Sequence, residues 1–432
     1  MSNICVIGAG YVGLVTSACF SDLGNRVVCL DIDKAKIELL RSGRMPIFEP
    51  GLEELVHRNT AAARLSFTTS YEAAAHRAEF AFVAVHTPSG PDGGADMRYV
   101  ESAVTRLGES VRDDVIVVTK STMPAGSGDW VETLVNERLR PGLAASVVSN
   151  PEFLREGSAV RDFMQPDRVV LGGSDDGAVE RVAELYRPLN APIIVTDKRT
   201  SEMIKYASNS FLATKISFIN EIASICEQVG ADVKQVARGM AYDGRIGPHF
   251  LGAGLGWGGS CFPKDVRALE HLAATNGCHP QLLRSVMEIN NDQRRRLVDK
   301  IRDEVGQSLH GRVVGILGLS FKPNTDDIRD APSLSVIEQL VRCGAQVRAY
   351  DPAAIKAATG EIDGIIPARD PYECAAGADA LALVTEWNEF KHLDLVRLRN
   401  LMRQPIIVDG RNVYDPATIR AAGFKYVSFG RP

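Results

Sequence analysis

Cys261 is the residue of this sequence best suited to covalent chemistry. It stands in the segment 256–265, which reads GWGGSCFPKD. The glycines would let a ligand approach closely, and Pro263 suits the first turn of a helix, so the sulfur is expected at a helix N-terminus. The positive end of that helix and the adjacent Lys264 would favour the thiolate, the nucleophilic form of cysteine. A cysteine is more often a packing residue, as we expect for three others on apolar strands or helices, Cys5, Cys19 and Cys29.

The second chemical feature is a glycine motif, GAGYVG at 8–13, which lies between an apolar run and a helical stretch. Gly8 permits a tight turn, Gly10 lets the backbone approach a pyrophosphate, and Gly13 allows the helix to pack closely on the strand. Asp31 ends the next predicted strand and would accept both ribose hydroxyls, which selects NAD over NADP. The competing interpretation is a glycine turn in a sheet that binds no cofactor.

Three polar residues could assist a nucleophilic cysteine. Asp265 follows Cys261 by four residues and could orient a water or a base, although an aspartate in a first helical turn is commonly just a cap. Lys205 and Asn209 are also four residues apart, so both would project from one face of a helix. Together they could donate to a developing alkoxide, or they could belong to an ordinary solvated helix surface.

Further candidates follow predicted strands, at the carboxyl edge where open α/β sheets bind ligands. The segment NPEFLREG at 150–157 carries two glutamates that could polarise a water. Thr87 and Thr122 would bring hydroxyls near the nicotinamide, but capping of the next helix explains them equally well. No histidine or cysteine spacing matches a metal site, so no metal is predicted.

These residues are set in an alternating pattern of strands and helices. Apolar runs that read as strands, separated by helix-like stretches, lie at 4–7, 26–30, 80–85, 115–119 and 145–149. The pattern predicts an NAD-binding Rossmann domain with an open parallel sheet over residues 1–198. From 201 to 229 apolar residues recur at steps of three and four, so a long helix is expected to join two domains and to pack against a second subunit.

The rest of the chain is expected to form two more domains. Residues 199–305 are predicted to be a helical dimerisation domain that carries the cysteine loop. Residues 306–432 repeat the opening plan of strand, helix, strand and acid, but an insertion at 321–329 replaces the glycine spacing, so a different ligand is expected. The predicted fold class is therefore α/β, with two Rossmann-like parallel-sheet domains joined by a long central helix and a helical dimerisation domain.

Composition excludes several classes of protein. The chain has 432 residues, of which 45% are hydrophobic and 24% charged, with a formal net charge of −5. No basic block is longer than Arg294–Arg296, so no surface for nucleic acid or anionic membrane is expected. Apolar runs fall short of the roughly 20 residues that a membrane helix needs. The N-terminal residues lead directly into the glycine motif and the eight cysteines are scattered, which predicts a cytoplasmic protein with reduced thiols.

Four motifs, in this order, give the chain a resemblance to a known family over essentially its whole length. They are GAGYVG at 8–13, NPEFL at 150–154, GGSCFPKD at 258–265 and GLSFKPNTDDIR at 318–329. The chain resembles the nucleotide-sugar 6-dehydrogenases of the UDP-glucose/GDP-mannose dehydrogenase family. The KPNTDD portion is more similar to members that act on UDP-glucose than to those that act on GDP-mannose or UDP-N-acetylmannosamine. One departure is His86, where a glycine is common in the family.

The resemblance implies roles for residues at matching positions. Those implied in catalysis are Cys261 as covalent nucleophile, Lys205, Asn209 and Asp265 as its oxyanion and water partners, and Thr122 and Glu152 as residues that position or activate water. Those implied to line NAD are Gly8, Gly10, Tyr11, Val12, Gly13, Asp31, Lys36, Thr87, Thr122, Glu156, Lys264 and Arg329. Those implied to hold the UDP-sugar, between the cofactor domain and a C-terminal UDP domain, are Glu152, Phe153, Leu154, Arg155, Lys205, Asn209, Phe250, Leu251, Gly258, Lys322 and Arg411, with Arg245 reaching the substrate of a neighbouring subunit.

The implied reaction is oxidation of UDP-glucose to UDP-glucuronate by a homodimer or higher homo-oligomer. Conversion of a primary alcohol to an acid removes four electrons, and each NAD accepts one hydride, so two NAD are consumed. The cysteine would trap the aldehyde as a thiohemiacetal, whose oxidation gives a thioester that water cleaves. Three alternatives stay open: a GDP-mannose or UDP-N-acetylmannosamine dehydrogenase, a two-electron hydroxyacid dehydrogenase, and a non-catalytic NAD-binding sensor.

Overall fold

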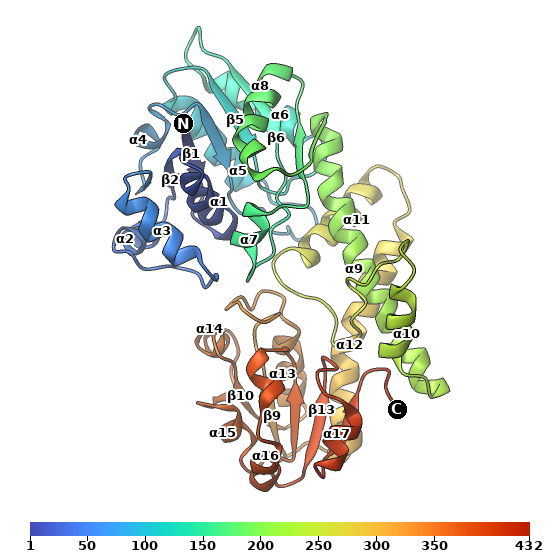
Figure 1. Cartoon of the computed structure of the whole chain (residues 1–432). Coiled ribbons are helices and arrows are strands. Elements are labelled where there is room, and N and C mark those ends of the chain that lie inside the picture. Colours follow the sequence, from blue (N-terminus) through green and yellow to red (C-terminus); the bar gives the residue numbers. More distant parts are fainter. The chain divides into compact units, whose positions relative to one another are not determined.

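The computed structural model describes residues 1–432, which divide into two compact units. Unit 1 comprises residues 1–208 with 267–276, and unit 2 comprises 209–266 with 277–432. Two of the three boundaries fall inside helices, because α9 (Lys198–Val229) and α11 (Phe262–Thr275) each begin in one unit and end in the other, and the third follows the end of α11. Each unit has its own sheet (Figure 1).

Unit 1 is built on an eight-stranded sheet in the order β3-β2-β1-β4-β5-β6-β7-β8. Its strands are β1 (Asn3–Ile7), β2 (Arg26–Leu30), β3 (Leu65–Thr68), β4 (Phe80–Val83), β5 (Val115–Thr119), β6 (Ala145–Ser149), β7 (Val169–Gly172) and β8 (Ile193–Thr196). Neighbouring strands run parallel except β6 and β7, which meet antiparallel through Ser149 and Gly172. The first six strands follow the doubly wound order, which opens a ligand crevice between β1 and β4.

Helices cover both faces of this sheet. One face is packed by α1 (Tyr11–Asp22), α2 (Lys34–Arg41), α3 (Leu52–Ala61), α7 (Ala159–Met164) and α8 (Asp176–Tyr186), with the 3₁₀ turn η1 (Arg187–Leu189) after α8. The other face is packed by α4 (Tyr71–Ala75), α5 (Arg98–Ser110) and α6 (Ser127–Arg138). The central strands are thus buried on both sides, as their continuous apolar sequences require.

Unit 2 contains a six-stranded parallel sheet in the order β11-β10-β9-β12-β13-β14, which is the same doubly wound order. Its strands are β9 (Val313–Leu317), β10 (Gln346–Tyr350), β11 (Ile365–Pro367), β12 (Ala380–Leu383), β13 (Ile406–Asp409) and β14 (Lys425–Ser428). Its helices are α10 (Val233–Ala241), α12 (Gln281–Val305), α13 (Pro332–Arg342), α14 (Ile355–Glu361), α15 (Pro371–Ala375), α16 (Leu395–Leu401), α17 (Pro416–Ala421) and the 3₁₀ turn η2 (Asn388–His392). α12, α13 and α14 pack on one face of the sheet, and α15, α16 and α17 on the other.

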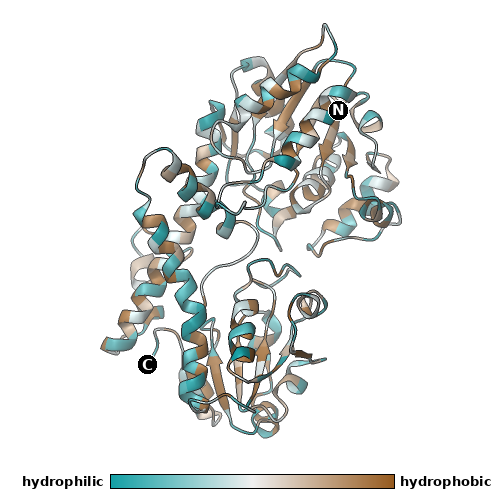
Figure 2. Cartoon of the chain, turned by 180° about the vertical axis from the view of Figure 1, so that it is seen from behind, coloured by the Kyte–Doolittle hydropathy of each residue, from teal (hydrophilic) through white to brown (hydrophobic).

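The distribution of apolar residues follows these layers. In Figure 2 the strands of both sheets are mostly brown, whereas the covering helices alternate between brown and teal along their length. That alternation is the one-sided apolar stripe of a helix that lies on a sheet. No helix is both long enough and apolar enough to cross a membrane.

The predicted α/β fold class, with two Rossmann-like sheets and a long central helix, is confirmed. The strands predicted at 26–30, 115–119 and 145–149 have the observed bounds. Strands β3, β7 and β8 were not predicted from the sequence, and the antiparallel β6–β7 step is an exception to the predicted parallel sheet. The three-domain division stays a prediction.

Candidate active site

The crevice between β1 and β4 has the features of a dinucleotide site. Gly8 has a φ of +105°, and a Cβ there would lie 2.5 Å from the carbonyl oxygen of Ala84, so only glycine fits. α1 begins at Tyr11, and Gly10 at its N-cap makes no side-chain cap, which leaves the first N–H groups for a phosphate. A Cβ at Gly10 would have only the His86 ring within 4 Å, so this backbone is open to a ligand. The remaining residues predicted in this motif, Val12 and Gly13, lie in the first turn of α1.

Asp31, at the end of β2, is placed for a ribose. Its carboxylate accepts the N–H of Ala9 at 2.8 Å and that of Asp33 at 2.9 Å, and it pairs with the ammonium of Lys36 at 3.1 Å. Partial burial pushes the pKa of Asp31 up, but these hydrogen bonds and the Lys36 charge outweigh burial and hold the pKa below its usual value. The carboxylate therefore stays ionised and can accept hydrogen bonds from the ribose hydroxyls of a cofactor bound in the glycine crevice.

Substitution of Asp31 by alanine is expected to raise the KM for NAD by about tenfold or more, while kcat at saturating NAD changes by less than about threefold. The physical reason is the loss of the charged acceptor for two ribose hydroxyls, each hydrogen bond to a charged group being worth about 1.5–3 kcal/mol. Asp33→Ala is the matched control, since Asp33 only caps α2 through the N–H of Lys36. Initial rates at varied NAD concentration distinguish Asp31→Ala from Asp33→Ala. Equal KM values for NAD in these two variants would contradict the assignment of Asp31 to the ribose.

Lys205 and Glu152 form a buried ion pair in unit 1. Lys205 lies in α9 and is 2% exposed, and Glu152 lies in the loop after β6 and is 5% exposed. The ammonium donates to Oε1 of Glu152 at 2.8 Å and to the carbonyl oxygen of the same residue at 2.6 Å. Burial alone would raise the pKa of Glu152, but the Lys205 charge and hydrogen bonds keep it below its usual value. The alternative interpretation of Lys205 as part of a solvated helix face is therefore wrong.

The loops after β4 and β5 are joined at the carboxyl edge of the same sheet. The hydroxyl of Thr87 donates to the carbonyl oxygen of Thr122 at 2.8 Å, and both residues are buried. The hydroxyl of Ser121 donates to the carbonyl oxygen of Val85 at 2.7 Å. α5 and α6 have other residues at their N-caps, so neither threonine is a helix cap.

The loop after β6 is anchored to the start of α1. The N–H of Gly157 donates to the Tyr11 hydroxyl at 2.7 Å and to Glu49 at 2.6 Å, and the N–H of Ala159 donates to the other oxygen of Glu49 at 2.8 Å. This contact places the predicted residues Phe153, Leu154, Arg155 and Glu156 in a loop that is fixed at both ends.

In unit 2, Cys261 lies at the N-cap of α11, as the sequence predicts. α11 begins at Phe262, and the N–H of Asp265 donates to the carbonyl oxygen of Cys261 at 2.9 Å, as in a first helical turn. Cys261 is half-buried, whereas the three cysteines predicted to pack, Cys5, Cys19 and Cys29, are fully buried. Burial raises the pKa of all three thiols well above the ordinary value, so they are chemically inert.

Asp265 is buried and hydrogen-bonded on both carboxylate oxygens. The Asn209 amide donates to Oδ2 at 2.6 Å, and the Lys264 ammonium donates to Oδ1 at 2.5 Å. Asp265 is therefore more than an exposed helix cap, and Asn209 is not part of a solvated surface. The Lys264 charge, which the sequence suggested as a support for the thiolate, is paired with Asp265, and the N-terminus of α11 lies at the sulfur-bearing residue.

The cysteine loop is seated closely on a second loop of unit 2. A Cβ at Gly258 would lie 2.3 Å from the carbonyl oxygen of Asp330, so only glycine allows this approach. The N–H of Gly259 donates to the carbonyl oxygen of Arg329 at 3.0 Å. The guanidinium of Arg411 donates to the carbonyl oxygen of Gly256 at 2.7 Å and so holds the start of the same loop. The predicted residues Gly258, Arg329 and Arg411 are thus brought together with Cys261 in one unit.

Other predicted residues have side-chain partners of their own. Arg155 pairs with Asp162, Arg245 with Asp243, and Arg329 with Asp327, each at 2.6 Å. The Lys322 ammonium lies 5.1 Å from the ring centre of Phe321, the Phe250 ring lies 6.3 Å from that of Phe262, and Leu251 is buried. The roles of Arg155, Arg245, Phe250, Leu251 and Lys322 toward ligands stay predictions.

Comparison with known proteins decides the family. Residues 2–190 match the NAD binding domain of the UDP-glucose/GDP-mannose dehydrogenase family, residues 199–292 its central domain, and residues 315–416 its UDP binding domain. The chain belongs to the UDP-glucose/GDP-mannose dehydrogenase family. The predicted family, an NAD-dependent dehydrogenase, and the predicted cofactor, NAD, are thereby confirmed.

Individual members of the family are similar to this chain over their whole length. A UDP-glucose 6-dehydrogenase of Rhizobium meliloti is 49% identical over 100% of both chains. The solved structure of a UDP-glucose dehydrogenase from Pyrobaculum islandicum is 39% identical, with a TM-score of 0.93 over 100% of this chain and 98% of that one. A UDP-D-ManNAc dehydrogenase from Pyrococcus horikoshii is 27% identical, with a TM-score of 0.88 over 99% of both.

The two sheets of this dehydrogenase differ at one decisive position. Asp351 ends β10 as Asp31 ends β2, because both strands occupy the same place in the doubly wound order. The carboxylate of Asp351 is buried and accepts the N–H of Leu319 at 2.7 Å, the N–H of Ser320 at 3.1 Å and the indole N–H of Trp387 at 3.0 Å. Asp351 is therefore closed to ribose hydroxyls, whereas Asp31 is partly exposed, and the match of residues 315–416 to a UDP binding domain agrees with the predicted change of ligand.

Two carboxylates that hold the active-site loops of unit 1 were not predicted from the sequence. One is Glu49, described above. The other is Glu202 of α9, which accepts the N–H of Gly126 at 2.6 Å and that of Gly128 at 2.7 Å and so fastens the chain after Thr122. Burial raises the pKa of Glu202 to about 7. Neither residue stands in a recognisable motif, so only its tertiary partners reveal its role.

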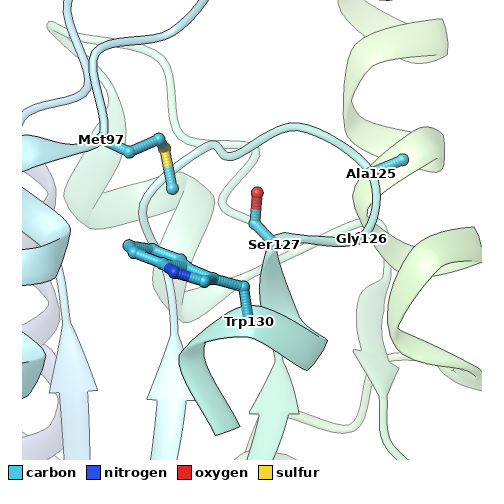
Figure 3. Close-up of a pocket in the computed structure, with 5 residues that line it drawn as sticks. All are labelled: Met97, Ala125, Gly126, Ser127 and Trp130. Atoms are coloured by element: carbon cyan, nitrogen blue, oxygen red, sulfur yellow. The ribbon is translucent and has the colours of Figure 1, made fainter. Parts of the chain in front are cut away.

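Two hollows in unit 1 lie outside the predicted site residues. The first, of about 300 Å³, is lined by Met97, Ala125, Gly126, Ser127 and Trp130, and Figure 3 shows the Met97 side chain directed toward the Trp130 ring. The second, of about 520 Å³, lies between the loop 90–98 and the C-terminal half of α11. Neither contains a nucleophile or a carboxylate of the predicted catalytic set.

Proposed function

We propose that this dehydrogenase oxidises UDP-glucose to UDP-glucuronate with two molecules of NAD. The observation that carries the proposal is the place of Cys261 at the N-cap of α11, one turn before an Asp265 carboxylate that Asn209 holds. A two-electron hydroxyacid dehydrogenase has no use for a nucleophilic thiol. The similarity to the Rhizobium meliloti enzyme supports the choice of sugar, since it extends over both chains entirely.

The thiol is the centre of the proposed mechanism. Bound NAD accepts one hydride in each of two oxidation steps. The thiolate of Cys261 adds to the carbon of the aldehyde that the first oxidation leaves, so that an S–C bond forms and the carbonyl oxygen becomes an alkoxide. Lys205 and Asn209 donate to the oxygen that carries this charge, and each preorganised donor contributes on the order of 3 kcal/mol. Removal of a hydride from the same carbon then leaves a thioester on the sulfur.

Water cleaves that thioester and frees the thiolate. We assign Asp265, Thr122 and Glu152 to the water, as residues that position it or accept its proton. The Glu152 carboxylate suits this role because its pKa is held below the usual range by Lys205, so it is ionised at neutral pH. The UDP portion is assigned to unit 2, whose sheet carries the UDP-binding match and whose cysteine loop is held by Arg411.

The ratio of NADH to sugar tests the function. Purified protein with limiting UDP-glucose and excess NAD is expected to give two NADH for each UDP-glucose consumed, with UDP-glucuronate as the product. A ratio of one with a free aldehyde would contradict the thiol mechanism. Parallel assays with GDP-mannose and UDP-N-acetylmannosamine decide the sugar, and binding of NAD without turnover of any of the three would favour the sensor.

We also propose a cytoplasmic homodimer or higher homo-oligomer. Phe211, Phe218 and Ile225 are exposed on α9 at steps of seven residues, so they lie on one side of the helix as an apolar stripe. Arg245, whose side chain is also exposed, would reach a neighbouring subunit's substrate. The location is inferred from the eight cysteines of the sequence, whose scattered spacing suits a reducing compartment.

A further inference from the structure

Lys120 is a buried ammonium whose hydrogen bonds go to neutral groups. It follows β5 directly, is 4% exposed, and donates to Oδ1 of Asn150 at 2.9 Å and to the hydroxyl of Tyr186 at 3.3 Å. Burial of a cation that has no directly bonded carboxylate is costly. An apolar side chain of similar length would fill the same space without that cost, so packing alone does not account for a lysine here.

The partners of Lys120 connect the strand ends from which two candidate catalytic residues emerge. Asn150 follows β6 directly, and its amide donates to the carbonyl oxygen of Val170 in β7 at 3.0 Å, while its Oδ1 also accepts the Tyr186 hydroxyl at 2.5 Å. Thr122 stands two residues after Lys120, and Glu152 stands two residues after Asn150. The hydrogen bond between Lys120 and Asn150 therefore fixes the ends of the two loops relative to each other.

Three ionisable groups face Lys120, each from a different element. They are Tyr186 of α8, Glu152 in the loop after β6, and Lys205 of α9. Burial lowers the pKa of Lys120 to about 8, the negative charge of Glu152 opposes this shift, and the positive charge of Lys205 adds to it. In turn, burial raises the pKa of Glu152, and the charge and hydrogen bond of Lys205, the N–H of Leu154 and, least of these, the positive charge of Lys120 hold it down.

We propose that Lys120 is a positioning residue of this active site, which sets Thr122 and Glu152 relative to each other through Asn150 and places a second positive charge beside the Glu152–Lys205 pair. The inference rests on the proposed function, in which Glu152 acts as a carboxylate. A nearby cation disfavours protonation of the Glu152 carboxylate. Loss of the Lys120 charge therefore moves the acid limb of the pH–rate profile to higher pH.

The test compares three variants. Lys120→Met removes the charge and the donor, Lys120→Gln removes the charge but keeps a donor, and Tyr186→Phe keeps the charge but removes the hydroxyl that bonds to Asn150. For Lys120→Met we expect kcat at pH 7 to fall by about 10- to 100-fold, with KM values for UDP-glucose and NAD changed by less than about threefold. The acid limb of the kcat profile is expected to move to higher pH in both Lys120 variants and to stay in place in Tyr186→Phe. At pH 9 the difference in kcat between the wild type and Lys120→Met is expected to become smaller, because burial lowers the pKa of Lys120 to about 8 and the wild-type side chain is then mostly uncharged.

A second measurement does not depend on turnover. Hydrogen–deuterium exchange of peptides covering 121–124 and 151–154 is expected to be faster in Lys120→Met than in the wild type, with unchanged exchange at the remote α17. Equal exchange, an unmoved acid limb in both Lys120 variants, or an equal shift in Tyr186→Phe would each overturn the inference and leave Lys120 as a packing residue. Failure of the proposed function is seen separately, in a wild-type enzyme that does not give two NADH for each UDP-glucose.

Discussion

Replacement of Cys261 by alanine is expected to lower UDP-glucuronate formation from UDP-glucose by about 10⁴-fold or more, with NAD binding retained. The thiol is the atom on which the half-oxidised sugar is carried, and loss of a covalent nucleophile removes the steps that depend on it rather than slowing one of them. Steady-state formation of UDP-glucuronate, separated from UDP-glucose by chromatography, measures the loss, because the first oxidation does not need the thiol. Mass spectrometry of the wild-type peptide that contains Cys261, after quenching during turnover, is expected to show a sugar-derived adduct.

Cys278 provides the matched control for this substitution. It is an exposed cysteine immediately beyond α11, the helix that Cys261 caps, so Cys278→Ala removes an accessible thiol that has no assigned role. We expect this variant to keep wild-type activity. A Cys261→Ala enzyme with more than about a tenth of wild-type kcat, and still two NADH per sugar, would contradict the covalent mechanism.

Replacement of Lys205 by methionine is expected to lower both activity and stability. Activity falls by about 10²- to 10³-fold in kcat, because a preorganised donor to the oxyanion is lost. Stability falls by about 3–5 kcal/mol, because Glu152 is left buried without its cation. The first effect is measured by steady-state kinetics, and the second by the denaturant midpoint of unfolding.

A double variant separates the two effects. Lys205→Met combined with Glu152→Gln removes both charges, so most of the lost stability is expected to return while activity stays low. Lys215→Met is the control on the same helix, since Lys215 donates only to the carbonyl oxygen of Ile246, and its midpoint is expected to stay close to that of the wild type. Recovery of activity in the double variant would contradict the role of Lys205 toward the substrate.

The parts of this molecule that could be predicted from sequence are those set by local chemistry. The glycine motif and Asp31 have a fixed spacing because one strand, one turn and one helix determine their relation, and the structure places them as expected. Cys261 could be located at a helix start because Pro263 favours the first turn. In each case the residues that decide the position lie within one or two elements of one another.

The ion pairs of the site could not be predicted in the same way. Lys205 meets Glu152 across 53 residues of sequence, and Asn209 meets Asp265 across 56, so their partners depend on how distant elements pack. Seen alone, Lys205 and Asn209 were as well explained by an exposed helix face. Lys36 and Lys264 pair with aspartates that are close in sequence. Lys36, expected to line NAD, pairs with Asp31. Lys264, expected to favour the Cys261 thiolate, pairs with Asp265.

The capping of Asp351 by Leu319, Ser320 and Trp387 has a kinetic consequence. The capped Asp351 closes this place of the C-terminal sheet to a ribose, so the glycine crevice of unit 1 is the dinucleotide site that the structure supports in each polypeptide. Two hydrides must leave every sugar, so the first NADH has to dissociate and a fresh NAD has to enter while the intermediate remains on the sulfur. In the proposed mechanism the lifetime of that intermediate is therefore expected to depend on the ratio of oxidised to reduced nicotinamide in the surrounding solution, and the enzyme is expected to slow in mid-cycle when NADH accumulates.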